Sequence, residues 1–130
     1  MLMGIPEFHR YITKCLGEQF AIGSHDYNDI TFVGQRIRWI MKNDKKDYIS
    51  VDQNRCIDEL EEIEFDKSMK DNIACDKSLH TCFRSVLGQL NWLQSRTQFQ
   101  IVYRFSRSAS KAASPTIGDV RLLNKLVRAT

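Results

Sequence analysis

The chain has 130 residues, of which 42% are hydrophobic and 27% charged. This composition is typical of a globular protein with one core, and it excludes an intrinsically disordered chain. No apolar run approaches the length of a membrane span, so we expect no membrane partner.

The formal net charge of +3 is distributed unevenly along the chain. Residues 44–77 carry eleven acidic and six basic side chains, whereas residues 78–130 carry eight basic and one acidic side chain. A basic C-terminal third suggests an electrostatic partner, and nucleic acid is the commonest such partner. The alternative is a helical region with a solvated basic outer face, and for any single basic residue this alternative is the better interpretation.

The N-terminal third is expected to contain one helix and a small antiparallel hairpin. Residues 7–18 have apolar side chains at helical spacing, and a short strand is predicted at residues 19–22. Residues 30–41 alternate as one strand does, and residues 48–51 form the return strand after a charged loop at residues 42–47. The alternation places Val33, Ile37, Trp39 and Met41 on one face and Ile30, Phe32, Gly34 and Arg36 on the other.

The remainder of the chain is predicted to be mainly helical. Asp52 is expected to cap a short helix, and residues 61–77 are expected to form a mobile acidic loop. Three amphipathic helices follow, and Thr116 with Asp119 resembles a capping box at the start of the third. The predicted inward residues are Phe83, Val86, Leu87, Leu90, Leu93, Ile101, Val102, Phe105, Ala109, Ala112, Ile117, Val120, Leu123 and Val127. The fold class is therefore α+β, with an N-terminal helix and hairpin followed by a mainly helical C-terminal part.

Two motifs in the chain occur in the same order in a known family. Residues 83–93 are Phe-Arg-Ser-Val-Leu-Gly-Gln-Leu-Asn-Trp-Leu, and residues 32–37 are Phe-Val-Gly-Gln-Arg-Ile. The first resembles a signature of copia-type retrotransposon polymerases, and the second resembles the Phe-Leu-Gly-x-x-Ile of their primer-grip hairpin. Residues 49–53 match the return strand, whose Gln opens the thumb. The resemblance covers roughly residues 8 to 130, and residues 98–100 depart from the family's Arg-Pro-Asp.

The resemblance implies a reverse-transcriptase segment downstream of the catalytic Tyr-x-Asp-Asp. Residues 1–52 would be the end of the palm with a primer-grip-like hairpin, and residues 53–130 a thumb-like and connection-like region. The implied partners are an RNA–DNA or DNA duplex and the remainder of a Pol polyprotein. Two Mg²⁺ ions would belong to the palm active site, because two-metal nucleotidyl transfer needs converging carboxylates and this chain has no Asp-Asp pair. We therefore assign no catalytic residue, metal ligand or cofactor, and we expect no polymerisation by the chain alone.

Candidate nucleic-acid-binding residues come from these motifs and from the basic helices. The motifs contribute Phe32, Gly34, Gln35, Arg36, Gln89 and Trp92, and the helices contribute Arg84, Arg96, Arg104, Arg107, Lys111, Arg121, Lys125 and Arg128. Arg104, Arg107 and Lys111 are three and four residues apart, so they share one helix face, and the last three cations repeat that spacing. Two such stripes could follow a phosphate backbone, which positions a duplex without reading its sequence. Trp39 and Trp92 could stack on bases, although core packing is the better interpretation for each.

Other functions and sites remain open from the sequence. A domesticated nucleic-acid-binding module, or a helical protein-interaction domain with an acidic partner, would have the same charge pattern. Cys75, His80 and Cys82 lack a fourth ligand, so we interpret them as loop and core residues rather than a zinc site. The cysteine spacing forms no disulfide framework, which predicts free thiols in the cytoplasm or nucleus. A hairpin without the palm sheet is expected to expose an apolar face or an unpaired edge and to favour self-association.

Overall fold

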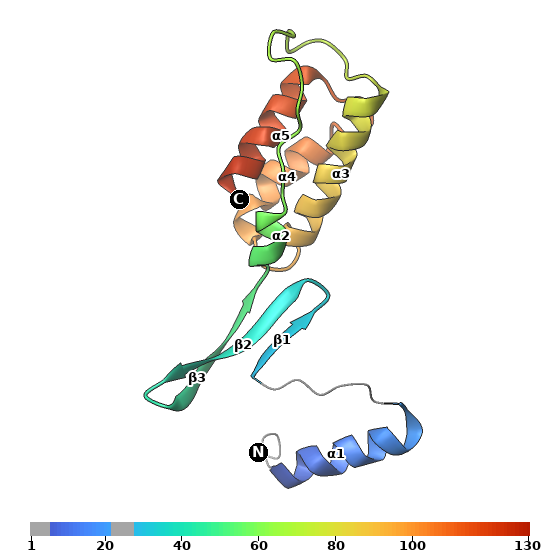
Figure 1. The fold of residues 1–130 in the computed structure, drawn as a ribbon. Coiled ribbons are helices and arrows are strands. Elements are labelled where there is room, and N and C mark those ends of the chain that lie inside the picture. Colours follow the sequence, from blue (N-terminus) through green and yellow to red (C-terminus); the bar gives the residue numbers. More distant parts are fainter. Residues whose placement is uncertain (1–5, 22–27) are drawn as a thin grey trace.

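Helices and strands are separated along the chain in the computed structural model, which describes residues 6–21 and 28–130 (Figure 1). A helix and a three-stranded antiparallel sheet come first, and a short helix leads from the sheet into a bundle of helices. The elements are α1 (Pro6–Gln19), β1 (Asp29–Phe32), β2 (Gln35–Lys42), β3 (Lys45–Asp52), α2 (Asn54–Asp58), α3 (Lys77–Gln94), the 3-10 turn η1 (Phe99–Ile101), α4 (Val102–Ala109) and α5 (Ile117–Ala129). The predicted α+β class, with a mainly helical C-terminal part, is confirmed.

The core lies between α3, α4 and α5. Most of the predicted inward residues are buried, because α3 and α5 each present one apolar face at helical spacing. The buried members are Phe83, Val86, Leu87, Leu90, Leu93, Ile101, Ile117, Val120, Leu123 and Val127, and Leu126 joins them. Val102 was predicted to point inward but is 41% exposed. The 3-10 turn before it has three residues per turn rather than 3.6, which changes the phase of the helical pattern.

The predicted single strand over residues 30–41 is wrong, because a tight turn at Val33 and Gly34 divides it into β1 and β2. Both turn residues have positive φ, 49° and 73°, as a two-residue hairpin turn requires. A β-branched residue rarely adopts such a φ, so Val33 gave no turn signal. A second tight turn at Asn43 and Asp44 replaces the predicted wide loop, and β3 is correspondingly longer than expected.

The turn also changes which side chains share a face of the sheet. Ile30 pairs with Ile37, and opposite residues of an antiparallel pair point to the same face. Ile30 and Phe32 therefore lie on the face of Ile37 and Trp39, not on the opposite face as predicted. Because Trp39 pairs with Ile49 on β3, this face is apolar across all three strands. Phe32 is 67% exposed and Ile49 53% exposed, which confirms the expected exposed apolar face.

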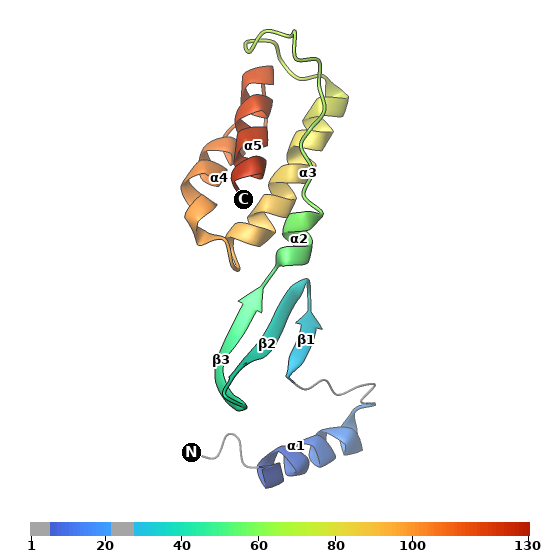
Figure 2. The same ribbon diagram turned by 60° about the vertical axis from the view of Figure 1, so that its left-hand side comes forward.

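Helix α1 contributes nothing to the core. It confirms the helix predicted at residues 7–18, but none of its residues is buried, and it lies apart from the bundle beyond the sheet (Figure 2). The strand predicted at residues 19–22 is wrong for residues 19–21, because Gln19 still belongs to α1 and the next two residues are in no strand. Residue 22 and most of the turn-rich stretch after it lie outside the described residues.

A long connecting segment, residues 59–76, runs along the bundle between α2 and α3 without a helix or strand of its own. Backbone hydrogen bonds join its end to the start of α5: Ile117 N–H donates to Ile73 O, and Gly118 N–H donates to Asp71 O, each at 2.9 Å. Its Ile63 side chain is 6% exposed and belongs to the core. The predicted mobile loop is thus anchored at both ends.

The start of α2 also differs from the prediction. Gln53, not Asp52, is the residue before its first turn, and no side chain caps it. Asp52 accepts a hydrogen bond of 3.3 Å from Asn54 N–H. At α5 the predicted capping box is present, since Thr116 and Asp119 each bond the other's backbone N–H.

Candidate nucleic-acid interface

A groove of about 400 Å³ lies between α4 and α5. Four of its lining residues are cations: Arg104 and Arg107 on α4, Lys111 in the turn after α4, and Lys125 on α5. We call this feature the α4/α5 groove. Arg104 and Arg107 share one face of α4, as predicted, but Lys111 does not lie on that helix, because α4 ends at Ala109 rather than at about residue 113. The turn after α4 brings Lys111 into the groove, and the packing of α5 against α4 adds Lys125.

The cations of the α4/α5 groove are available to a ligand. None of the ion pairs found among residues 6–21 and 28–130 involves Arg104, Arg107, Lys111 or Lys125. All four residues are exposed. Since each unpaired cation keeps its full charge, the groove attracts anions without breaking an existing contact.

One carboxylate, that of Asp119, lines the same groove, but it is already engaged. Its Oδ2 accepts hydrogen bonds from the backbone N–H and the hydroxyl of Thr116, each at 2.9 Å. Two exposed apolar side chains complete the lining relevant to binding: Tyr103, 77% exposed, and Leu122, 48% exposed. No sequence motif pointed to either residue, although Tyr103 adjoins Arg104, a predicted site residue.

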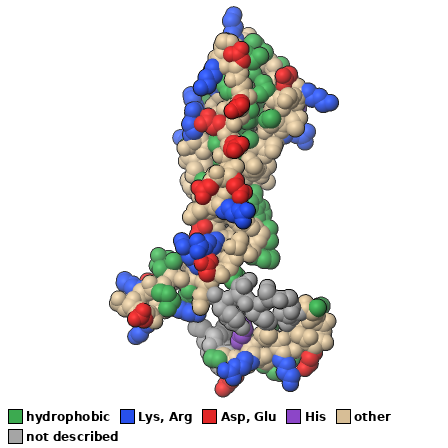
Figure 3. Space-filling view, in the orientation of Figure 1, with side chains coloured by type: hydrophobic (Ala, Val, Ile, Leu, Met, Phe, Trp, Pro, Cys, Tyr) green, Lys and Arg blue, Asp and Glu red, His purple; other side chains and the backbone are tan. Residues whose placement is uncertain are grey.

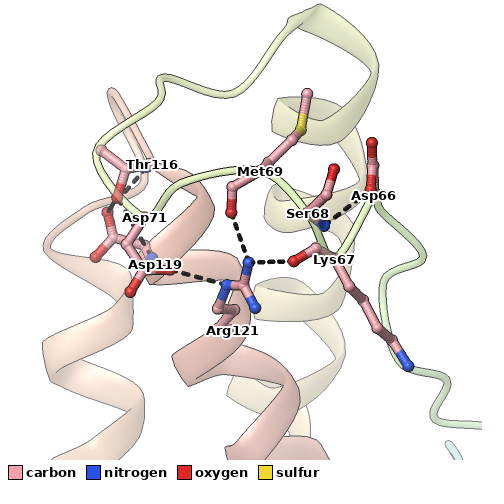
Figure 4. A network of polar contacts seen from close by, with 8 residues as sticks. All are labelled: Asp66, Lys67, Ser68, Met69, Asp71, Thr116, Asp119 and Arg121. Carbon is pink, nitrogen blue, oxygen red and sulfur yellow. Dashed lines mark hydrogen bonds and ion pairs between the residues drawn. The ribbon is translucent and has the colours of Figure 1, made fainter.

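The other side of α5 faces the connecting segment, and its cations have partners. Arg121 Nε lies 2.8 Å from Asp71 Oδ1, an ion pair whose N–H does not point at the carboxylate. Its Nη2 donates hydrogen bonds to the carbonyl oxygens of Lys67 and Met69, at 2.9 and 2.7 Å (Figure 4). The guanidinium also lies 5.2 Å from the centre of the Phe65 ring. Arg121 therefore holds the segment and is not a free cation.

Arg128 is the second cation on this side of α5. Its Nη1 lies 3.5 Å from Glu62 Oε2, with both side chains partly exposed. Acidic side chains form a column along this face of the bundle, with Lys and Arg along the edges (Figure 3). The acidic segment thus neutralises two of the three α5 cations that the sequence grouped as one stripe.

A buried asparagine joins the same segment to α5. Asn124 is 5% exposed, and its amide makes both hydrogen bonds that a neighbouring strand would make. Its Oδ1 accepts from Ile63 N–H and its Nδ2 donates to Ile63 O, each at 2.9 Å. The sequence gave no signal for this contact, because Asn124 lies on the predicted inner face of an otherwise apolar pattern.

On the sheet, the predicted site residues are separated from the groove. Arg36 makes a two-point contact with Asp29, with Nε 2.9 Å from Oδ1 and Nη2 2.5 Å from Oδ2. The hydrogen bond from Arg36 lowers the pKa of the Asp29 carboxyl. Phe32 is exposed and Gln35 half-buried. These residues do not converge with the helical cations.

Gly34 and Trp92 meet where the sheet touches the bundle. Cys56 Sγ donates to Gly34 O at 3.5 Å, and a Cβ at Gly34 would lie 3.2 Å from that sulfur and 3.6 Å from Trp92 Nε1. Arg96 lies over the Trp92 ring, 4.8 Å from its centre. Trp92 thus has structural contacts on two sides, which agrees with the packing interpretation.

The last two candidate nucleic-acid-binding residues lie on α3. Arg84 and Gln89 are exposed on α3, outside the lining of the α4/α5 groove.

The possible metal ligands have other surroundings. His80 Nε2 is 2.7 Å from Ala112 O, and burial raises the pKa of the Cys75 thiol. Within the described part of the chain, no group of three or more His, Cys, Asp and Glu side chains could hold a metal ion. The described residues therefore do not fit a Mg²⁺ pair.

Two further findings concern the whole chain. No helix among the described residues is long and apolar enough to cross a membrane. Comparisons with protein families, curated proteins and solved structures gave no significant match.

Proposed function

We propose that the chain binds nucleic acid independently of sequence, through phosphate contacts made by the cations of the α4/α5 groove. The observation that carries this proposal is the set of four exposed cations, Arg104, Arg107, Lys111 and Lys125, none of which forms an ion pair with another described residue. Cations that contact phosphates fix a duplex in place without selecting its sequence. Arg84, exposed on α3, would extend the same electrostatic field.

We propose further that the chain is a fragment of a copia-type reverse transcriptase that handles template and primer rather than joining nucleotides. This rests on the two motifs at residues 32–37 and 83–93. The first motif forms a β-hairpin turn and the second lies on α3, and Gly34 of one approaches Trp92 of the other. The free cysteines support a cytoplasmic or nuclear location, where thiols stay reduced.

The test is a salt titration on an RNA–DNA hybrid. For a protein that neutralises Z phosphates, the logarithm of the affinity falls with the logarithm of salt concentration with a slope of about −0.9Z for duplex DNA. Wild-type protein should bind hybrids of unrelated sequence equally and show a steep slope. Replacing Arg104, Arg107 and Lys111 together with Ala should weaken binding to every sequence and flatten the slope by about two to three units.

A matched variant controls for net charge. Lys14→Ala, Lys67→Ala and Lys70→Ala together remove the same charge, but none of these lysines lines the α4/α5 groove. This control should keep nearly the wild-type slope. Equal losses in the two variants would mean that binding depends on total charge alone, and a wild-type affinity that does not change with salt would contradict phosphate binding altogether.

A further inference from the structure

An exposed aromatic ring stands in the α4/α5 groove, where phosphate binding alone does not need one. Tyr103 lines the groove and is 77% exposed, the highest exposure among the large hydrophobic residues of the described chain. Arg107 is four residues further along α4, so its guanidinium lies on the same helix face. An aromatic face beside cations is the combination by which proteins hold single strands, with bases on the ring and phosphates on the cations.

The opposite wall supplies a second apolar surface. Leu122 of α5 lines the groove and is 48% exposed, although the α5 residues on its inner face are buried. Lys125 is three residues beyond Leu122, so α5 repeats the arrangement of apolar side chain and cation found on α4. A flat ring entering between the two walls would contact apolar side chains and leave its charged group near the cations.

The size of the groove favours an unpaired base. Its volume of about 400 Å³ is at the lower end of ordinary small-ligand pockets. The faces of bases in a duplex are covered by their neighbours in the stack, so an intact duplex offers no base face to Tyr103 along its length. An unpaired base exposes both faces and can enter.

We propose that the α4/α5 groove takes one unpaired nucleotide of a single-stranded nucleic acid, with the base against Tyr103 and the flanking phosphates against Arg104, Arg107, Lys111 and Lys125. This inference rests on the proposed function, since it specifies which form of nucleic acid the groove holds. The charge of the lining supports an anionic ligand, because the only carboxylate among the groove's lining residues, Asp119, is bonded to Thr116.

The test compares single-stranded oligothymidine with a duplex of the same length, by fluorescence anisotropy at one salt concentration. Tyr103→Ala should weaken oligothymidine binding roughly 5- to 150-fold, the usual range for loss of one stacked base. It should leave duplex binding unchanged. Tyr103→Phe keeps the ring and should bind as wild type does. Tyr48→Ala, which removes an exposed tyrosine of the sheet, is the matched control and should have no effect.

Each other outcome overturns the inference in a recognisable way. If Tyr103→Ala weakens both ligands equally, or neither, the groove does not hold a base, while salt-dependent duplex binding would keep the proposed function. If wild-type protein binds neither ligand, both proposals fail together. If polyglutamate displaces oligothymidine as well as unlabelled oligothymidine does, the groove accepts an acidic peptide instead.

Discussion

The two sides of α5 carry cations at similar spacing but differ in what those cations contact. On the side of the connecting segment, Arg121 and Arg128 are paired with Asp71 and Glu62. Lys125 borders both sides, but it forms no ion pair with another described residue, and on the side of α4 it lines a groove with three more such cations. The first side uses charge to hold a segment without regular structure, and the second leaves charge available. Net charge along the sequence therefore does not reveal which cations can bind a ligand.

The largest expected loss of stability comes from replacing Asn124, because its amide makes the two hydrogen bonds that a neighbouring strand would otherwise make with the backbone of Ile63. Asn124→Ala leaves the N–H and C=O of Ile63 buried without partners, and each such group costs roughly 1–3 kcal/mol. We expect a loss of about 2–4 kcal/mol in the free energy of unfolding, measured in urea. Lys125→Ala, one residue away and exposed, should change it by less than about 0.5 kcal/mol. Similar losses in both variants would show that the two sides of α5 do not differ.

Arg121 gives the next largest effect. Arg121→Ala removes two hydrogen bonds to carbonyl oxygens, the ion pair with Asp71 and the contact with the Phe65 ring. The Asp71 side chain is 73% exposed, so its ion pair contributes little, and we expect a total loss of about 1–2 kcal/mol. Arg128→Ala loses a single exposed ion pair and should cost less than about 0.5 kcal/mol. Equal costs would mean that the segment is not held by Arg121.

A pair of glycine substitutions measures how closely the segment approaches α5. A Cβ at Gly118 would lie 3.1 Å from Asp71 Cβ and 3.2 Å from Asp71 O, so Gly118→Ala must displace the segment. A Cβ at Gly88 on α3 would meet nothing within 4 Å. Gly88→Ala should therefore raise the free energy of unfolding by about 0.5–1 kcal/mol, whereas Gly118→Ala should lower it by a similar amount. A stabilising Gly118→Ala would show that the segment yields without cost.

The helices could be predicted from the sequence because their signals are local. The apolar faces of α3 and α5 repeat at helical spacing, and Thr116 with Asp119 marks the start of α5 three residues apart. The turn at Val33 could not be predicted, because its positive φ is imposed by the pairing of β1 with β2 rather than by the preference of valine.

The candidate site was predicted only in part, because the sequence groups residues on one helix but does not show contacts between distant segments. Arg104 and Arg107 lie on one face of α4, and their spacing was enough to group them, whereas Lys111 lines the groove from the turn after α4. Whether Arg121 and Arg128 remain available to a ligand depends on the path of the connecting segment, which contacts both of them and is fixed by hydrogen bonds between residues 61 positions apart. No pattern within a single helix contains that information.

The smallest expected effect is a change in the salt dependence of nucleic-acid binding. It compares the cations on the two sides of α5 directly. Lys125→Ala removes one unpaired cation from the α4/α5 groove, so the salt slope on an RNA–DNA hybrid should flatten by about one unit. Arg128→Ala removes the same charge three residues away, but that charge already interacts with Glu62, so the slope should remain close to the wild-type value. Glu62→Ala sharpens the test, because it frees Arg128 and should make the slope steeper if phosphates can reach that side. Equal slopes for Lys125→Ala and Arg128→Ala would show that the acidic segment does not shield its cations from nucleic acid, and the distinction between the two sides of α5 would then apply to stability alone.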